Sequence, residues 1–549
     1  MRRVLFGCVI AGCAFAQSPF IYNRSVLNAA SYIPPTLPGG AIAQGSIFSI
    51  FGSGLGPATG VQVSSFPLNT TLAGTSITVT QGSTTVNAIP IYVSVTQINA
   101  IMPSNAPLGV AVVRVITGNP PQSNPMRVNI VTTAFGIFTA TGTGLGPGIL
   151  QNFISGTNEP INSPTIAATP GQIMVLWGTG LGPVAADNVA PTAGNLPTQV
   201  AISVGGVPAT NILYSGRTPC CSGVDQIVFS VPNNAPLGCW VPVYIQTAGS
   251  VVSNVVTMAI TPNGSSCLTS ASPFAGAGNF GAFVSLRVTT HEDIGTLSAV
   301  DVVGDYTGAI AYKAPASNFP FNPVLSLPPS GTCTAYSVKG DLLGGDALPG
   351  AVPAGGTGLT LGSAFTLSGP GGMQMIPNFL NTNPIQYLGG SISSNLFPSS
   401  LFLNPGSYNL SSLTGGTIGS FSVTGTMPQP LTWTNRSSIF TVSRSQPLNV
   451  TWSGGSGTQV FVVGFGVDLP TNSTSVFGCL ASVGATSFTV PAVFLSNFPA
   501  TRANPLQSKS VVYLGNAPNA LSAPALNASG LNSGYAAFQF ATGKTVFFQ

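Results

Sequence analysis

The chain has 549 residues, of which 44% are hydrophobic and only 4% are charged, and its formal net charge is +4. Because an ordinary soluble protein carries about 25% charged residues, uncharged polar residues and glycine must cover most of this surface. The length predicts several domains. The absence of a Lys/Arg cluster along the sequence argues against nucleic acid as a partner.

The first sixteen residues predict an export signal. Arg2 and Arg3 precede an apolar stretch, and Ala14-Phe15-Ala16 matches a cleavage site that places the mature N-terminus at Gln17. One alternative is open, because Ile10-Ala11-Gly12-Cys13 resembles a lipobox and would put a lipid anchor on Cys13. Beyond this leader no stretch approaches the ~18 apolar residues of a membrane-spanning helix. We therefore expect a secreted protein without a transmembrane segment.

An internal repeat organises the first half of the mature chain. The sequence FGSGLGP at Phe51–Pro57 recurs as WGTGLGP at Trp177–Pro183, and Gln97–Gly109 recurs as Gln226–Gly238. A nearly constant offset, close to 130 residues, indicates two copies of one domain. Ser123-Asn124 and Ser253-Asn254 are a third match, and we place the copies at residues 17–137 and 138–262.

Each copy reads as a run of short strands rich in Val, Ile and Thr, separated by Gly, Pro and Asn. Strands at this spacing in a domain of about 100 residues are typical of an immunoglobulin-like β-sandwich. Strand signals continue after residue 262 with longer loops, and Met427–Pro430 indicates a linker. We therefore predict an all-β chain in which two further sandwich or jelly-roll-like domains, 263–428 and 429–549, follow the tandem pair. A single domain over 263–549 is the alternative.

Four short segments carry a resemblance to a known family. They are the Asn28–Tyr32 entry (NAASY), both G-x-G-L-G-P turns, Val93–Ala100 and Ala134–Phe138. With these, the stretch from Val26 to about Ile260 resembles the Solibacter-type domain of secreted acidobacterial proteins. Each half is also similar to IPT/TIG domains, the immunoglobulin-like sandwiches of cell-surface proteins. The resemblance implies a fold and an extracellular setting, and it implies no catalytic residues. The family domain usually lies at the C-terminus, whereas here a long segment follows it.

The six cysteines of the mature chain predict disulfides, because their number is even and the chain is exported. Cys220 and Cys221 come just before a predicted strand, and Cys239 comes just after it. Cys239 therefore lies at the opposite end of this strand, too far from Cys220 or Cys221 to form a disulfide. Cys267 returns to the end where Cys239 lies. We therefore predict the pairs Cys239–Cys267, Cys333–Cys479 and Cys220–Cys221, the last between adjacent residues. The alternative to this vicinal pair is that one of its two cysteines pairs elsewhere and the other is free.

Four of the ten acidic residues fall within fourteen positions: Glu292, Asp293, Asp301 and Asp305. Two of them could act as acid and base in glycoside hydrolysis, or the group could bind Ca²⁺ through carboxylate oxygens. We rank calcium ahead of catalysis, and exposed turns ahead of both. The single histidine, His291, is expected in an exposed loop, and no G-x-S-x-G motif supports a serine nucleophile.

The four tryptophans divide into two predicted groups. Trp177 and Trp240 are expected to fill sandwich cores. Trp433 and Trp452 are flanked by Thr, Ser and Asn, which makes them the better candidates for platforms that stack a sugar ring, although we rank core packing ahead of this role.

Taken together, these features favour a non-catalytic extracellular or cell-surface protein that binds polysaccharide or another extracellular protein and needs no cofactor. Two alternatives stay open. One is a secreted polysaccharide hydrolase that uses the carboxylates near 292–305, and the other is a structural surface component that assembles with itself.

Overall fold

The computed structural model describes residues 18–118, 122–247, 251–268, 278–292, 300–315, 317–346, 356–380, 386–412, 415–455, 457–501, 507–517 and 526–549. The regular secondary structure of these residues is almost entirely strand, with one short α-helix, α1 (Ala492–Leu495), and two 3₁₀ turns, η1 (Leu342–Gly344) and η2 (Arg436–Ser438). The all-β prediction is confirmed. Within these ranges, none of the helices is long and apolar enough to cross a membrane.

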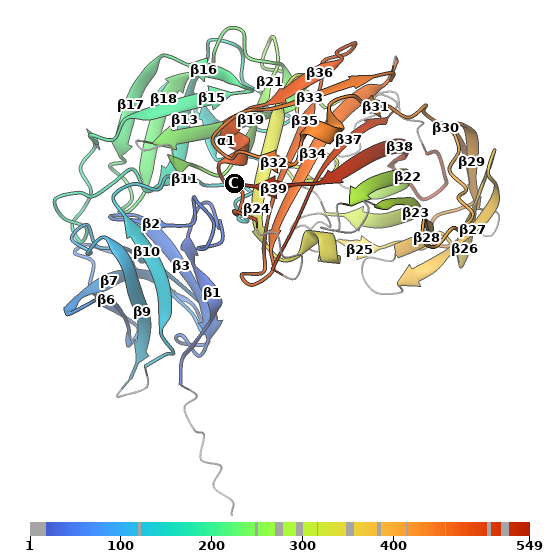
Figure 1. Ribbon diagram of the computed structural model, residues 1–549. Coiled ribbons are helices and arrows are strands. Elements are labelled where there is room, and N and C mark those ends of the chain that lie inside the picture. Colours follow the sequence, from blue (N-terminus) through green and yellow to red (C-terminus); the bar gives the residue numbers. More distant parts are fainter. Residues whose placement is uncertain are drawn as a thin grey trace, which may run out of the picture.

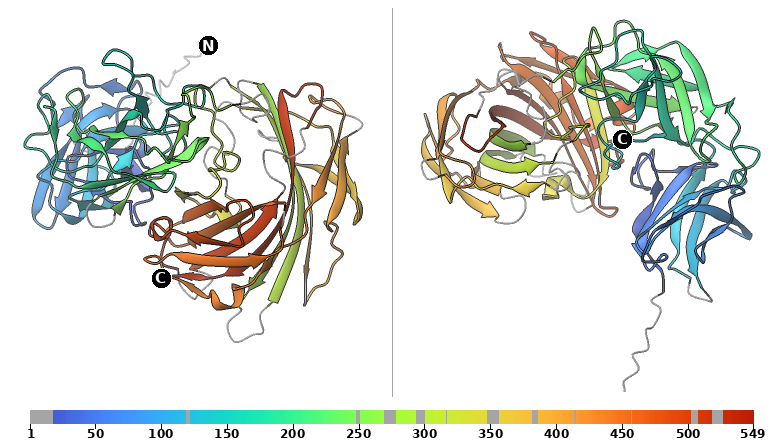
Figure 2. Two further views of the ribbon diagram at one scale, coloured as in Figure 1. Left: turned by 90° about the horizontal axis from the view of Figure 1, so that it is seen from above. Right: turned by 180° about the vertical axis from the view of Figure 1, so that it is seen from behind.

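The strands assemble into three units (Figure 1). The first two lie end to end along one side of the molecule, and the third, larger unit lies beside them (Figures 1 and 2). The third unit packs mainly on the second unit, where the ring of Tyr244 meets that of Phe494 edge-on at 5.5 Å between centroids.

Unit 1 is a sandwich whose two layers form one hydrogen-bonded sheet. Its strands are β1 (Phe20–Asn28), β2 (Ile42–Ala43), β3 (Ile47–Ser53), β4 (Val61–Gln62), β5 (Thr71–Leu72), β6 (Thr75–Gln81), β7 (Thr84–Val93), β8 (Gln97–Ile101), β9 (Gly109–Thr117) and β10 (Met126–Val131). The order is β1-β3-β8-β7-β6-β9-β10-β2. The first half of β7 pairs with β6 and its second half with β8, so that β7 passes from one layer to the other. Alternate Val and Ile side chains point between the layers and are fully buried.

Unit 2 has two separate sheets around a similar core. Its strands are β11 (Gly136–Ile137), β12 (Leu150–Asn152), β13 (Ile173–Thr179), β14 (Gly194–Asn195), β15 (Val200–Val204), β16 (Val207–Ala209), β17 (Ile212–Arg217), β18 (Asp225–Ser230), β19 (Gly238–Thr247), β20 (Val251–Val252) and β21 (Val256–Ile260). One sheet runs β11-β13-β18-β17-β14, and the other runs β16-β15-β19-β20. Since β11 pairs with β13, unit 2 begins slightly before the predicted boundary at residue 137.

The repeated Ser-Asn dipeptide has the same structural role in both units. Ser123 Oγ accepts from Val115 N, and Asn124 bridges to both backbone polar atoms of Ile21 at 2.8 and 3.0 Å. In unit 2, Ser253 Oγ accepts from Ile245 N, and Asn254 bridges to Ile137 at 2.8 and 2.9 Å. The side chain of Asn therefore ties the first strand of each unit to the segment that precedes its last strand. The two units are structural copies.

Over its described residues, unit 3 contains eighteen strands, and thirteen of them form one large sheet. Its strands are β22 (Gly278–Glu292), β23 (Val300–Ala314), β24 (Cys333–Lys339), β25 (Thr357–Gly358), β26 (Ala364–Gly369), β27 (Gly372–Leu380), β28 (Gln386–Ser394), β29 (Gly406–Ser412), β30 (Phe421–Met427), β31 (Thr432–Trp433), β32 (Thr441–Val442), β33 (Leu448–Ser453), β34 (Gln459–Asp468), β35 (Ser473–Leu480), β36 (Ser487–Val490), β37 (Ser508–Ala517), β38 (Ser533–Thr545) and β39 (Phe547–Phe548). The order of the large sheet is β24-β35-β34-β37-β38-β22-β23-β28-β27-β26-β29-β30, and its thirteenth strand, β25, pairs with β23 beside this path. Two cores lie against it, one under β34, β35 and β37 and one between β22, β23 and the strands β26 to β30.

The predicted boundary at residue 428 does not separate two sheets. β24 pairs with β35 over seven residues, and β22 pairs in parallel with β38 over twelve. Strands from both sides of the boundary are therefore hydrogen-bonded to each other in one sheet. The alternative, a single C-terminal unit, matches the structure, because its central strands come from distant parts of the sequence.

Candidate binding site

The structure removes Asp305 from the candidate catalytic or calcium-binding carboxylates. Its side chain is fully buried. Arg287 donates two hydrogen bonds to this carboxylate, from Nε to Oδ1 at 2.6 Å and from Nη2 to Oδ2 at 2.7 Å. The backbone N–H groups of Phe402 and Leu403 also donate to Oδ2. With these four donors, Asp305 holds the loop before β29 against β23 and is not available to a ligand.

Among the described side chains of this cluster, Asp301 does not form a site with Asp305. Asp301 Oδ1 accepts a hydrogen bond from His291 Nδ1 at 2.8 Å, across the β22–β23 pair. Four residues along one strand separate Asp301 from Asp305 by about 13 Å, which exceeds the spacing of a glycosidase pair. The backbone of Glu292 pairs with Val300, while its side chain and all of Asp293 lie outside the described residues. Within those residues, no group of three or more His, Cys, Asp or Glu could hold a metal ion.

Trp433 and Trp452 lie in a core, which is the interpretation that we ranked first, whereas Trp177 and Trp240 do not fill the cores in which they were expected. Trp452 and Trp433 face each other across β31 and β33 and are buried, 3% and 6% exposed, in the core under the large sheet. They therefore do not form a sugar-stacking surface. Trp177 and Trp240 are instead half-buried. Their indole N–H groups donate to Gln151 Oε1 at 2.6 Å and to Pro320 O at 3.4 Å, respectively. Trp452 shares its strand face with buried Leu448 and Val450, which places it in the core.

The structure contains three disulfides, Cys220–Cys221, Cys239–Cys267 and Cys333–Cys479. These are the three pairs that the strand order predicts. Cys220 and Cys221 lie exposed in the turn between β17 and β18. Three disulfides fit an extracellular protein.

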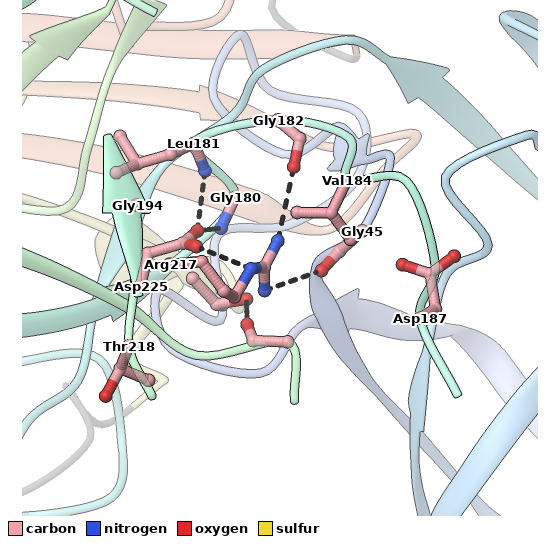
Figure 3. A network of polar contacts seen from close by, with 12 residues as sticks. Gly45, Gly180, Leu181, Gly182, Val184, Asp187, Gly194, Arg217, Thr218 and Asp225 are labelled. Carbon is pink, nitrogen blue, oxygen red and sulfur yellow. Dashed lines mark hydrogen bonds and ion pairs between the residues drawn. The ribbon is translucent and has the colours of Figure 1, made fainter. Parts of the chain in front are cut away.

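A polar network fastens unit 1 to unit 2 beside this turn (Figure 3). Arg217 is buried between the units, where it donates to Gly45 O and Gly182 O at 3.2 Å each and lies 3.3 Å from Asp225 Oδ1. Asp225 Oδ2 accepts from the backbone N–H groups of Gly180 and Leu181, both at 2.8 Å. The second G-x-G-L-G-P turn therefore has a structural role, because its backbone binds a carboxylate of its own unit.

Asp225 gives unit 2 a pH-dependent stability. Burial raises the pKa of Asp225 to about 6, against the opposing effects of Arg217 and the two backbone N–H groups. The folded protein therefore holds this proton more tightly than the unfolded chain does. We expect the contribution of Asp225 to be complete below pH 4 and to fall by about 3 kcal/mol as the pH rises to 6 and beyond.

The measurement is the unfolding free energy of the wild-type protein minus that of Asp225→Asn, from pH 4 to pH 7. The other titrating groups cancel in this difference. A difference that stays flat, or that rises with pH, would contradict the prediction.

The strongest candidate binding surface lies on the outer side of β26, β27, β29 and β30. Two rows of outward-facing side chains cross these strands at right angles, and each row begins at a methionine of β27. In register, the rows are Met375, Thr366, Ser411 and Ser422, and Met373, Ser368, Asn409 and Thr424. We call these eight residues the neutral face.

The neutral face combines hydroxyl and amide groups with exposed apolar side chains. Met373 and Met375 are each 72% exposed. Thr366 Oγ1 lies 2.9 Å from Ser411 Oγ, and Asn409 Nδ2 donates to Ser422 Oγ at 2.8 Å. The residues between them, such as Leu367, Tyr408 and Val423, point into the core. Sequence reasoning missed this face, although the strict alternation of Phe421–Met427 (FSVTGTM) was a signal for it.

The chain matches no protein-family model and no curated protein. Similar solved structures include the Bacteroides ovatus mixed-linkage glucan utilization locus SGBP-B in complex with a mixed-linkage heptasaccharide (10% identity, 40% of this chain and 45% of that chain, TM-score 0.20). The plexin A4 full extracellular region (13%, 43% and 17%, TM-score 0.16) and Gamma-CGTASE from alkalophilic Bacillus clarkii (8%, 50% and 35%, TM-score 0.17) are also similar. The chain spans less than half of each of them, and likeness at these scores carries no argument about activity.

Proposed function

We propose that the protein is a non-catalytic extracellular binding protein whose ligand is an uncharged polysaccharide. The observation that carries this proposal is the neutral face. Its eight residues offer hydroxyl and amide groups in two regular rows, with exposed methionines at one end.

The chemistry of the face favours a neutral sugar polymer. A sugar ring presents hydroxyl groups at its edge and C–H groups on its faces, and these match the Ser, Thr and Asn side chains and the methionine side chains respectively. No member of the face carries a charge, so a charged ligand would lose hydration there without gaining a partner. Large exposed apolar side chains are also characteristic of interaction surfaces.

A charge on the neutral face should weaken binding. We expect Thr424→Asp to lower the retention of the mature protein, residues 17–549, on neutral polysaccharides such as cellulose, starch or curdlan by about tenfold or more, because the new carboxylate would be desolvated without a partner. The matched control is Thr85→Asp, which places the same charge on an exposed threonine of unit 1. Equal retention of the two variants would contradict the proposal.

The same assay separates the two alternatives. Release of reducing ends would show hydrolysis and would overturn the non-catalytic reading. Concentration-dependent assembly without retention on any polymer would instead favour a structural surface component.

A further inference from the structure

Unit 1 has an unusual distribution of charge. From residue 17 to residue 158 the chain contains three charged side chains only, and all three are arginines: Arg24, Arg114 and Arg127. The first acidic residue of the whole chain is Glu159. The structure brings all three arginines into one groove of about 790 Å³, which we call the arginine groove.

Three strands supply these arginines. Arg114 on β9 and Arg127 on β10 lie on the outer side of the β9–β10 pair, where Arg127 is opposite Val112. Arg114 and Arg127 are therefore diagonal neighbours on adjacent strands, with their Cα atoms about 7–8 Å apart. Arg24 comes from the irregular part of β1, has a φ of 53°, and donates its N–H to Met126 Sδ across the groove.

The guanidinium groups of the groove are oriented but not neutralised. Arg24 Nη1 donates to Pro470 O at 2.9 Å, and Arg114 Nη1 donates to Ser123 O at 3.1 Å. Each guanidinium has five donors, so most of its capacity remains. Among the described residues, the ion pairs are formed by other basic side chains. With no acidic residue in unit 1, the groove has a positive potential that its own unit does not compensate.

The second copy of the domain shows that the fold does not need these arginines. The equivalent hydrogen bonds of Ser123 and Ser253 align Arg114 with Tyr244, and the strand register aligns Arg127 with Thr257. Tyr244 is 9% exposed, with Phe494 of unit 3 against its ring, and Thr257 is 3% exposed. These two positions are thus buried and uncharged in unit 2, whereas in unit 1 Arg114 is half-buried and Arg127 is exposed.

We propose that the arginine groove is a second binding site, for a polysaccharide that bears carboxylates, such as a polyuronate. The planar guanidinium matches a carboxylate through two parallel hydrogen bonds. Phe20, which lines the groove and is 50% exposed, offers a ring face beside the arginines, and Tyr22 lies 6.2 Å from it. The C–H face of a sugar ring matches an aromatic ring, and the carboxylate of a uronate matches a guanidinium. The site is separate from the neutral face and does not rest on it.

The test titrates the mature protein with polygalacturonate, alginate, dextran and dextran sulfate at low and at physiological salt. We expect the wild-type protein to bind the two polyuronates, and binding to weaken with salt. The variant Arg114→Met/Arg127→Met should bind them at least tenfold more weakly and keep its retention on neutral polysaccharide. Arg436→Met, a half-buried arginine of unit 3, is the matched control.

A single variant, Arg127→Met, keeps the test valid if the double variant misfolds, because Arg127 is exposed. Failure of the wild-type protein to bind polyuronates, stronger binding to dextran sulfate than to either polyuronate, or unchanged binding in both variants would overturn this proposal. Loss of neutral-polysaccharide retention by Thr424→Asp, with polyuronate binding intact, would confirm that the two sites are distinct. Polyuronate binding without any retention on neutral polymers would overturn the neutral-face proposal alone.

Discussion

Replacing Arg287 with methionine should destabilise unit 3 by about 3–5 kcal/mol. The substitution leaves the fully buried carboxylate of Asp305 without its counter-ion, and an uncompensated buried charge has a cost of this order. Methionine keeps an unbranched apolar side chain but also removes the guanidinium, whose central carbon lies 5.8 Å from the centroid of the Phe540 ring, so the loss combines the ion pair with this contact. The measurement is the guanidinium unfolding midpoint, followed by the fluorescence of Trp433 and Trp452, which lie in this unit.

The control for this prediction is Arg436→Met, which should change the free energy of unfolding by less than about 1 kcal/mol. Its guanidinium has a hydroxyl partner, Thr542, at 3.4 Å. The double variant Arg287→Met/Asp305→Asn should recover much of the loss, because both charges are then absent. If Arg287→Met and Arg436→Met were equally stable, the ion pair between Arg287 and Asp305 would contribute nothing to the free energy of unfolding.

Asp225 and Asp305 use the same device in different units. Each carboxylate is fully buried, each is paired with one arginine, and each accepts from two consecutive backbone N–H groups, Gly180 and Leu181 or Phe402 and Leu403. In a chain with ten acidic residues, at least two are therefore used to fix loops against strands. This explains why grouping the acidic residues along the sequence did not predict a catalytic pair.

The fold of units 1 and 2 could be predicted from the sequence, because short-range signals specify it. The internal repeat marks the two copies, and the alternation of Val and Ile with polar residues marks the strands. Unit 3 could not be divided correctly, since β22 pairs with β38 and β24 with β35. Pairings between such distant segments leave no local pattern, whereas Met427–Pro430 resembles a linker locally although it lies within one unit.

The candidate sites were harder to predict than the fold, for a related reason. The polar neighbours of Trp433 and Trp452 suggested an exposed position beside the favoured core packing, but in a strand the neighbours along the chain point to the opposite face. The basic residues of unit 1 looked scattered, because Arg24 is far in sequence from Arg114 and Arg127 and the three meet only through the strand order. The available signal was the absence of any other charge before Glu159.

The three disulfides should differ in their effect on stability in the order of the loops that they close. Cys333 and Cys479 lie directly opposite each other on β24 and β35, and their sequence separation is 146, against 28 for Cys239–Cys267 and 1 for Cys220–Cys221. Loop-closure entropy then predicts a loss of about 5 kcal/mol for Cys333→Ala/Cys479→Ala and about 3.5 kcal/mol for Cys239→Ala/Cys267→Ala. The vicinal pair closes almost no loop, so Cys220→Ala/Cys221→Ala should cost far less.

The effect of the Cys333–Cys479 pair should be the largest for a second reason. In the large sheet β24 is an end strand that pairs with β35 only, and both cysteines are buried in the same core as Trp452. Loss of the bond should therefore loosen β24 first, which hydrogen exchange of its backbone amides would detect before global unfolding. If the three double-alanine variants lost equal stability, or if β24 exchanged no faster without the bond, loop closure would not be the source of the stabilisation.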